Sequence, residues 1–311
     1  MSADAKLQKG KRLMRCMLVT VMLSSMSALV FHAVLPQISD EFGLTLAQTS
    51  WLTSAYTLIY AFGTVTYGKL ADRFQLKPLL TFGMTLFAAG SLIGLVSETF
   101  AAALLGRCLQ SAGASVIPAL SLIIPVRYFA PEQRGSALSM SAVGAALGSA
   151  LAPFVSGFIV SVANWRWLFL PSLLILLLLP LYRKYLAYEP KEAPQAFDWL
   201  GGILLASSVT LLLFGITGQS WQCLLASPVS FLLFLARIQT AKAPFIDPKL
   251  FANKSYALGL LLAFLIAAIG ISLYFVPPIL FAQVYRLDAS WIGFAMVPAA
   301  IASSLLGRLG G

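Results

Sequence analysis

Ten apolar stretches follow one another along almost the whole chain, and only short polar segments separate them. One α-helix needs about 20 apolar residues to cross the hydrocarbon core of a bilayer. We therefore predict an all-α, polytopic bundle of membrane helices. The predicted helices lie at 14–35, 50–67, 79–97, 100–125, 136–160, 167–182, 199–217, 221–236, 256–280 and 291–306.

The composition excludes most other classes of protein. Charged residues make up 10% of the 311 residues, whereas an ordinary soluble domain has about 25%. This excludes a soluble enzyme, a disordered protein and a coiled coil. The three cysteines, Cys16, Cys108 and Cys223, are far apart and odd in number, so we expect no disulfide framework. A single histidine leaves no ligand set for a His-based metal site and no catalytic triad, so we expect no enzyme activity, metal or cofactor.

The net charge of +10 would suit a nucleic-acid-binding protein, but the positions of the charges indicate membrane topology instead. All but three of the 21 lysines and arginines fall on one side of the predicted helices, the exceptions being Arg107, Arg166 and Arg286. By the positive-inside rule that side is cytoplasmic, and the N-terminus lies there too. We expect a multi-pass protein of a cytoplasmic membrane, with lipid but no nucleic acid as a partner.

The loop after the second predicted helix reads Gly68-Lys69-Leu70-Ala71-Asp72-Arg73-Phe74-Gln75-Leu76-Lys77. Gly68 would let two helices approach closely, and Asp72 could pair with a cation on a neighbouring loop. With Arg73 and Arg134, these residues would form a cytoplasmic gate that breaks and remakes. A second interpretation stays open, in which the segment is only a charged hairpin that follows the positive-inside rule.

Several motifs resemble the major facilitator superfamily. The loop resembles the signature G-x-L-x-D-R-x-G-x-K, except that Gln75 and Leu76 depart from it. Arg107-Cys108-Leu109-Gln110-Ser111-Ala112-Gly113-Ala114 resembles R-x-x-Q-G-x-G, and the segments 127–129 and 131–135 look like the next cytoplasmic loop. Gly148-Ser149-Ala150-Leu151-Ala152-Pro153-Phe154-Val155-Ser156-Gly157 is similar to the antiporter motif G-x-x-x-G-P-x-x-G-G. The segments 165–169 and 197–201 resemble the fourteen-helix drug:proton antiporters, among which the tetracycline/proton antiporters are the most similar.

The resemblance implies a transporter that exports an amphipathic, drug-like compound such as tetracycline in exchange for protons, as in bacterial multidrug and antibiotic resistance. Its partners would be this small molecule and protons, with the proton gradient as the energy source. Residues 1–185 would form a six-helix half, 186–254 a two-helix insert and 255–311 the start of a second half. Helices eleven to fourteen would be missing. Two alternatives stay open, namely proton-independent uptake or facilitated transport of a small metabolite, and a truncated fragment that does not transport.

Arg107 is the most conspicuous candidate site residue, because it is the one strongly ionised side chain well inside a predicted helix. Burying a cation there costs at least ~2.5–3.5 kcal/mol, so it should face a cavity or a polar partner. The resemblance implies proton coupling or a response to substrate, and a structural hydrogen-bonding role is the alternative. His32, with a reference pKa near ~6.5, could carry a proton or remain a neutral hydrogen-bonding group.

Small residues recur every four positions at Gly144, Gly148, Ala152 and Ser156, which favours close helix packing, and Pro153 permits a bend. The resemblance implies that Gly148, Ala152, Pro153 and Gly157 form the antiporter packing motif, although ordinary tight packing explains them as well. Where it leads us to expect membrane carboxylates, the chain has Ser27, Ala28 and Ser149. The candidates for lining a polar cavity are Gln110, Ser115, Ser27, Tyr56 and Gln48.

Overall fold

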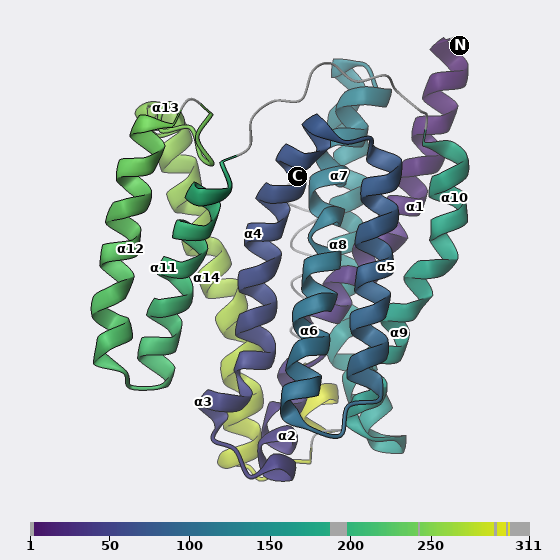
Figure 1. Cartoon of the computed structure of the whole chain (residues 1–311). Coiled ribbons are helices and arrows are strands. Elements are labelled where there is room, and N and C mark those ends of the chain that lie inside the picture. The colour runs from purple at the N-terminus through teal and green to yellow at the C-terminus, as the bar shows by residue number, and fades with distance from the viewer. Residues whose placement is uncertain (1–2, 187–197, 242, 289–290, 297, 299–311) are drawn as a thin grey trace. The chain divides into compact units, whose positions relative to one another are not determined.

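The computed structural model describes residues 3–186, 198–241, 243–288, 291–296 and 298, and every regular element among them is a helix (Figure 1). In this part of the chain, seven helical stretches are long and apolar enough to cross a membrane. The predicted all-α, polytopic fold is therefore confirmed. Each predicted stretch up to 256–280 coincides with helical residues, whereas most of 291–306 lies outside the described residues.

The elements follow one another without strands in the described residues. The first part of the chain holds α1 (Ala3–Leu29), η1 (His32–Val34), α2 (Leu35–Phe42), α3 (Leu46–Thr49), α4 (Trp51–Arg73), α5 (Leu76–Leu95), α6 (Phe100–Ala114), α7 (Val116–Tyr128), α8 (Pro131–Val162), η2 (Trp165–Phe169), α9 (Leu170–Leu173), η3 (Leu174–Leu178) and α10 (Leu179–Tyr185). The second part holds α11 (Trp199–Thr217), α12 (Trp221–Thr240), α13 (Lys249–Ala252) and α14 (Lys254–Gln283).

The chain forms two compact units, one of residues 1–191 with 274–311 and the other of residues 192–273. Helix α14 begins in the second unit and ends in the first. The predicted division into a six-helix half, an insert and the start of a second half stays a prediction.

In the first unit, α1 packs along α8, and α6 packs against both α5 and α4 (Figure 1). The α1–α8 contact depends on small residues, because a methyl group at Gly144 would collide with the carbonyl oxygen of Leu18. One turn further along, a methyl group at Gly148 would collide with the carbonyl of Met22. Close packing through small residues is what their four-residue spacing favours.

Two buried apolar clusters fill this unit. The larger one contains residues from α1, α4, α5, α7 and α10, for example Met17, Leu80 and Leu120. The smaller one lies around η1, α2 and η2 and includes Phe31, Ile38, Leu52, Trp165 and Phe169. Within it the rings of Phe31 and Phe169 lie 4.7 Å apart, centroid to centroid. This second cluster supports the site described next.

The second unit contains the antiparallel pair α11 and α12 (Figure 1). The buried Asp198 joins the start of α11 to the last turn of α12. Its carboxylate accepts a hydrogen bond from the backbone N–H of Gly201 at 3.1 Å and pairs with Arg237 Nε at 3.0 Å. It also accepts one from the N–H of Phe245 at 3.3 Å. Asp198 therefore acts as the N-cap of α11 and as a bridge to the end of α12.

A buried arginine between three membrane helices

Arg107 lies on α6 and is fully buried between α1, α4 and α6. Its Nε donates to the carbonyl of Leu52 at 3.2 Å. Its Nη1 donates to the carbonyl of Ser27 at 3.1 Å and to Gln110 Oε1 at 2.6 Å. The guanidinium thus joins the three helices mainly through backbone carbonyls, and the expectation that this cation needs polar partners fits its surroundings.

Two aromatic rings cover the guanidinium. Its central carbon lies 4.0 Å from the ring centroid of Tyr56 on α4 and 4.5 Å from that of Phe31. Such contacts contribute about 2 kcal/mol or more when they are desolvated. The rings therefore compensate part of the cost of burying the charge and also restrict where the guanidinium can lie.

The network continues from Gln110 toward α5. Gln110 Nε2 donates to Ser91 Oγ at 2.8 Å, and Ser91 Oγ donates to the carbonyl of Phe87 at 2.8 Å. Gln110 is fully buried, so it connects two helices and does not face an open cavity. Among the described residues, no carboxylate forms an ion pair with Arg107. Ser149, at one of the positions that lack an acid, donates to the carbonyl of Ala145 at 2.9 Å.

Three buried hydroxyl groups gather near Tyr56, whose ring covers this arginine. Ser24 and Ser27 on α1 and Tyr56 on α4 form no side-chain hydrogen bond of good geometry with the described residues. The two serine side chains lie beside the Tyr56 hydroxyl. Ser27 and Tyr56, both candidates from the sequence, are therefore brought together with Arg107.

The other candidates lie elsewhere. Ser115 is fully buried, donates to the carbonyl of Ala112 at 2.8 Å and occupies the space beside Gly63. Gln48 belongs to the capping box of α3, where its Oε1 accepts the N–H of Thr45 at 2.9 Å. Neither residue joins the cluster around Arg107. No group of three or more His, Cys, Asp or Glu able to hold a metal ion occurs in the described part of the chain.

His32 lies in η1, where the first membrane segment is interrupted between α1 and α2. It is buried, and its Nδ1 lies 3.1 Å from the carbonyl oxygen of Leu29. Its neighbour in sequence, Phe31, contacts Arg107, with its ring centroid 4.5 Å from the central carbon of the guanidinium. The structure therefore brings both residues with a predicted coupling role to one region, and that role stays a prediction.

The predicted gate residues are not brought together. Asp72 and Arg73 are exposed at the end of α4, and the described residues form no ion pair with Asp72. Arg134 instead caps the end of α7, donating to the carbonyls of Val126 at 3.2 Å and Phe129 at 3.4 Å. At Gly68 a methyl group would meet nothing within 4 Å, so the close helix approach expected there is absent. Gating by these residues stays a prediction.

The predicted packing residues Gly148, Ala152, Pro153 and Gly157 are all buried on α8. Pro153 lies inside this helix, which continues without interruption from Pro131 to Val162. The packing geometry is present in the structure, whereas an antiporter role for it stays a prediction.

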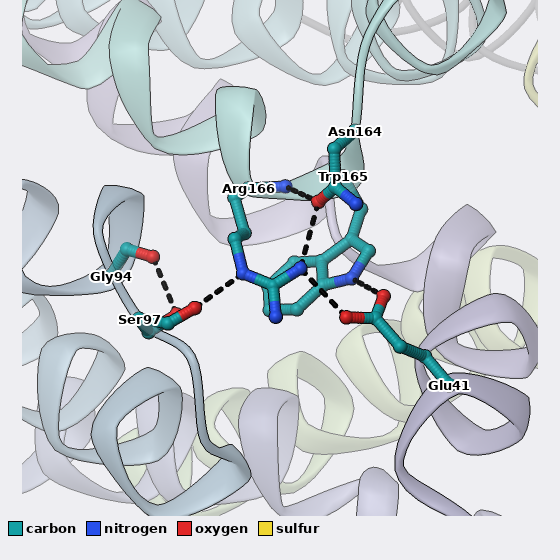
Figure 2. A network of polar contacts seen from close by, with 6 residues as sticks. All are labelled: Glu41, Gly94, Ser97, Asn164, Trp165 and Arg166. Carbon is teal, nitrogen blue, oxygen red and sulfur yellow. Dashed lines mark hydrogen bonds and ion pairs between the residues drawn. The ribbon is translucent and has the colours of Figure 1, made fainter.

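Sequence reasoning missed a second polar network, which lies between α2, the α5–α6 loop and η2 (Figure 2). Glu41 Oε2 accepts the indole N–H of Trp165 at 2.6 Å, and Glu41 Oε1 pairs with Arg166 Nη1 at 2.7 Å. Arg166 also donates to the carbonyl of Ser97 and to Asn164 Oδ1. These residues tie the end of α2 to the α5–α6 loop and to η2.

Comparison with known proteins identifies the fold that carries this site. The profile of the major facilitator superfamily matches residues 17–311. The chain belongs to the major facilitator superfamily. This is a family of membrane transporters and not of enzymes, as expected from the sequence.

Three members of the family show which transporters the chain is similar to in sequence. The chain is 26% identical over 325 residues to multidrug resistance protein 3 of Bacillus subtilis and covers 62% of it. It is 30% identical over 304 residues to the efflux pump dotC of Dothistroma septosporum and covers 52% of it. It is 25% identical over 301 residues to the riboflavin transporter RibZ of Clostridioides difficile and covers 65% of it. These alignments include 100%, 92% and 94% of the chain, which thus spans roughly half to two thirds of each relative.

Solved structures confirm the fold independently of sequence. The human organic anion transporter MFSD10 superposes with a TM-score of 0.62 at 15% identity, covering 96% of this chain and 71% of that one. A peptide transporter POT superposes with a TM-score of 0.63 at 18% identity, covering 96% and 68%. At these identities the likeness establishes a shared fold and nothing about substrate.

Proposed function

We propose that this chain belongs to a secondary transporter that exports an amphipathic, drug-like compound in exchange for protons. The observation that carries the proposal is Arg107, a cation fully buried between α1, α4 and α6 of a fold shared with multidrug efflux pumps. Nothing in simple helix packing calls for an arginine at such a depth, and ionisable residues inside membrane proteins are functional candidates by default.

The geometry supports a role in which Arg107 senses movement of α1. Two of its three partners are backbone carbonyls, at Ser27 on α1 and Leu52 on α4. A carbonyl moves only when its helix moves, so a shift of α1 against α6 would break the contact to Ser27 and free an N–H group. In a transporter that alternates between two orientations, arrival of a substrate or a proton would then change the partners of this guanidinium.

Proton-independent transport is the second candidate function. The observation that favours it is the absence of any carboxylate beside Arg107 among the described residues. A carboxylate is the usual proton carrier in the membrane, whereas the titratable groups near Arg107 among the described residues include His32, Tyr56 and Cys108. Similarity to the fourteen-helix tetracycline/proton antiporters favours the proton-coupled form, so tetracycline belongs among the first compounds tested.

The proposed location is a bacterial cytoplasmic membrane, with the N-terminus in the cytoplasm. This orientation follows from the distribution of lysine and arginine along the chain by the positive-inside rule. It places Arg166 on the opposite side of the membrane from Arg12 and Arg183. Cysteine labelling of intact cells at position 166 and at position 183 would test this orientation, since an impermeant reagent should modify only the former.

The function is tested by loading bacteria that express the chain with ethidium or tetracycline and following efflux with and without an uncoupler. We expect efflux that the uncoupler abolishes and that Arg107→Gln reduces by about tenfold or more. Arg183→Gln, which removes an exposed arginine of α10, is the matched control. Efflux that persists with the uncoupler would reject proton coupling, and no efflux of any compound in a broad panel would reject export.

A further inference from the structure

The guanidinium of Arg107 has donors that no described residue uses. Arginine carries five N–H groups in a fixed planar fork. Those on Nε and Nη1 bind carbonyl and amide oxygens, but Nη2 is buried and without a partner. Because the rings of Tyr56 and Phe31 and three acceptors hold the guanidinium in place, Nη2 has a fixed position from which to bind an acceptor.

The buried hydroxyl groups next to it strengthen the point. Ser24, Ser27 and Tyr56 are each at most 2% exposed, and their side-chain oxygens form no hydrogen bond of good geometry with the described residues. The two serine side chains lie beside the Tyr56 hydroxyl, and the Tyr56 ring covers the guanidinium. Buried polar groups in folded proteins are nearly always paired, so a buried guanidinium donor next to these hydroxyl groups needs an explanation. Each of these groups can donate a hydrogen bond, which favours a ligand that accepts hydrogen bonds.

The local charge also calls for a negative partner. A buried cation without a counter-ion is unfavourable in a medium of low polarity. Glu41, the carboxylate at the outer end of the same membrane segment, is bound to Trp165 and Arg166 instead. The polar groups in contact with Arg107 are neutral, namely two carbonyls and the amide of Gln110.

We propose that Arg107, Ser24, Ser27 and Tyr56 form an anion-recognition site, whose ligand is a carboxylate-like group of the transported compound or a free inorganic anion such as chloride. The first of these sources rests on the proposed export function, while the second does not. In either case the site favours anionic amphipathic compounds over cationic ones. Because the four residues are buried, an anion reaches Nη2 only after the Tyr56 side chain or α1 moves.

The test uses the purified 311-residue chain in detergent, with three probes. Sodium chloride represents a free anion, fluorescein an amphipathic organic anion and ethidium an amphipathic cation. Binding of the two dyes is followed by fluorescence anisotropy, and binding of chloride by the rise in unfolding temperature, which saturates for a specific ligand. The same titrations on Arg107→Gln measure general effects of salt and of dye partitioning into the micelle.

Three variants test the site and one serves as a control. Arg107→Gln removes the charge, and Gln110→Glu neutralises it by placing a carboxylate where the amide lies 2.6 Å from Nη1. We expect each to weaken anion binding about tenfold or more. Tyr56→Phe keeps the ring over the guanidinium and removes only the hydroxyl, so we expect a loss of about three- to tenfold. Arg183→Gln should leave binding unchanged, and Gln110→Glu and Tyr56→Phe keep the test valid if Arg107→Gln does not fold.

Each outcome decides the proposal. The proposal is supported if chloride, fluorescein or both in competition bind saturably to the wild-type protein and this binding is lost in Arg107→Gln and Gln110→Glu. Which of the two anions binds shows whether the ligand is a free inorganic anion or an anionic group of an organic compound. Failure of both anions to bind the folded wild-type protein overturns it, as does ethidium binding that equals fluorescein binding and is independent of Arg107. The uncoupler experiment tests export separately. Anion binding without efflux would reject only the export function. Uncoupler-sensitive ethidium efflux without anion binding would reject only the anion site.

Discussion

Glu41 and Arg166 are separated by 125 residues and form an ion pair of 2.7 Å between α2 and η2 (Figure 2). Their side chains are 34% and 19% exposed, so the charge pair alone contributes about 0–1 kcal/mol. The other oxygen of Glu41 accepts the N–H of Trp165, which is fully buried. The carboxylate therefore performs two separate tasks, and these can be separated by mutation.

Replacing Glu41 by glutamine should cost little, since the amide oxygen can still accept the Trp165 N–H and only the charge attraction to Arg166 is lost. Glu41→Ala should destabilise the protein by about 1–3 kcal/mol, because it leaves a buried indole N–H unpaired. Unfolding titrations in mixed detergent micelles, followed by tryptophan fluorescence, measure both changes.

Asp40→Asn is the matched control, because Asp40 is the exposed neighbour of Glu41 on α2. It should change the free energy of unfolding by less than about 0.5 kcal/mol. Equal losses for Glu41→Ala and Glu41→Gln would show that the bond to Trp165 contributes no stability.

The sequence predicts the helices well, because membrane crossing requires long apolar stretches and little else. It also singles out Arg107, since a cation inside such a stretch is conspicuous. The partners of Arg107 are hidden from it, because the carbonyls of Ser27 and Leu52 lie 80 and 55 residues away and any residue type supplies a carbonyl. Glu41 is missed for a related reason, as an acid at the end of an apolar segment has the pattern of an ordinary surface residue.

The small residues of α8 offer a second prediction. Gly148→Ala should destabilise the fold by about 1–3 kcal/mol, because the added methyl group meets the carbonyl of Met22 and forces α1 away from α8. The free energy of unfolding in mixed micelles, together with trypsin resistance at 37 °C, checks this.

Gly135 provides the control within the same helix. A methyl group there meets nothing within 4 Å, so Gly135→Ala should be neutral or should stabilise α8 by up to about 1 kcal/mol through helix propensity. If both substitutions behave alike, close contact between α1 and α8 is not what requires glycine at 148.

The bridge at Asp198 predicts a dependence of stability on pH. Burial by itself would raise the pKa of Asp198, but hydrogen bonds from Gly201, Arg237 and Phe245 and the charge of Arg237 lower it overall below its ordinary value of 3.8. A carboxyl group with a lower pKa in the folded state stabilises the fold fully above its unfolded pKa, and this contribution is lost as the pH falls through the folded pKa. The wild-type protein should therefore keep this contribution at neutral pH and lose it as the pH falls below 3.8, the ordinary pKa of the group.

Asp198→Asn should abolish this contribution, so its unfolding temperature should be lower at neutral pH and should approach that of the wild-type protein as the pH falls. Asp247→Asn is the comparison, because the carboxylate of Asp247 accepts a single hydrogen bond among the described contacts, from the backbone N–H of Lys249 at 3.0 Å. A wild-type protein and an Asp198→Asn variant that differ by the same amount at every pH would contradict the prediction.

The final prediction concerns the predicted gate residues Asp72 and Arg134, which form no ion pair with each other in the described part of the chain. Arg134 caps α7, so Arg134→Gln should cost about 0.5–1 kcal/mol, while Asp72→Asn should cost almost nothing. Since the two side chains do not contact each other, their effects on the free energy of unfolding should add within about 0.3–0.5 kcal/mol in a double-mutant cycle. The Glu41→Gln and Arg166→Gln cycle, run in the same micelles, is the positive control and should show coupling of up to about 1 kcal/mol, because those two side chains do form a pair. Coupling between Asp72 and Arg134 as large as that of the control would mean that a closed gate, with the two residues paired, dominates in the micelle.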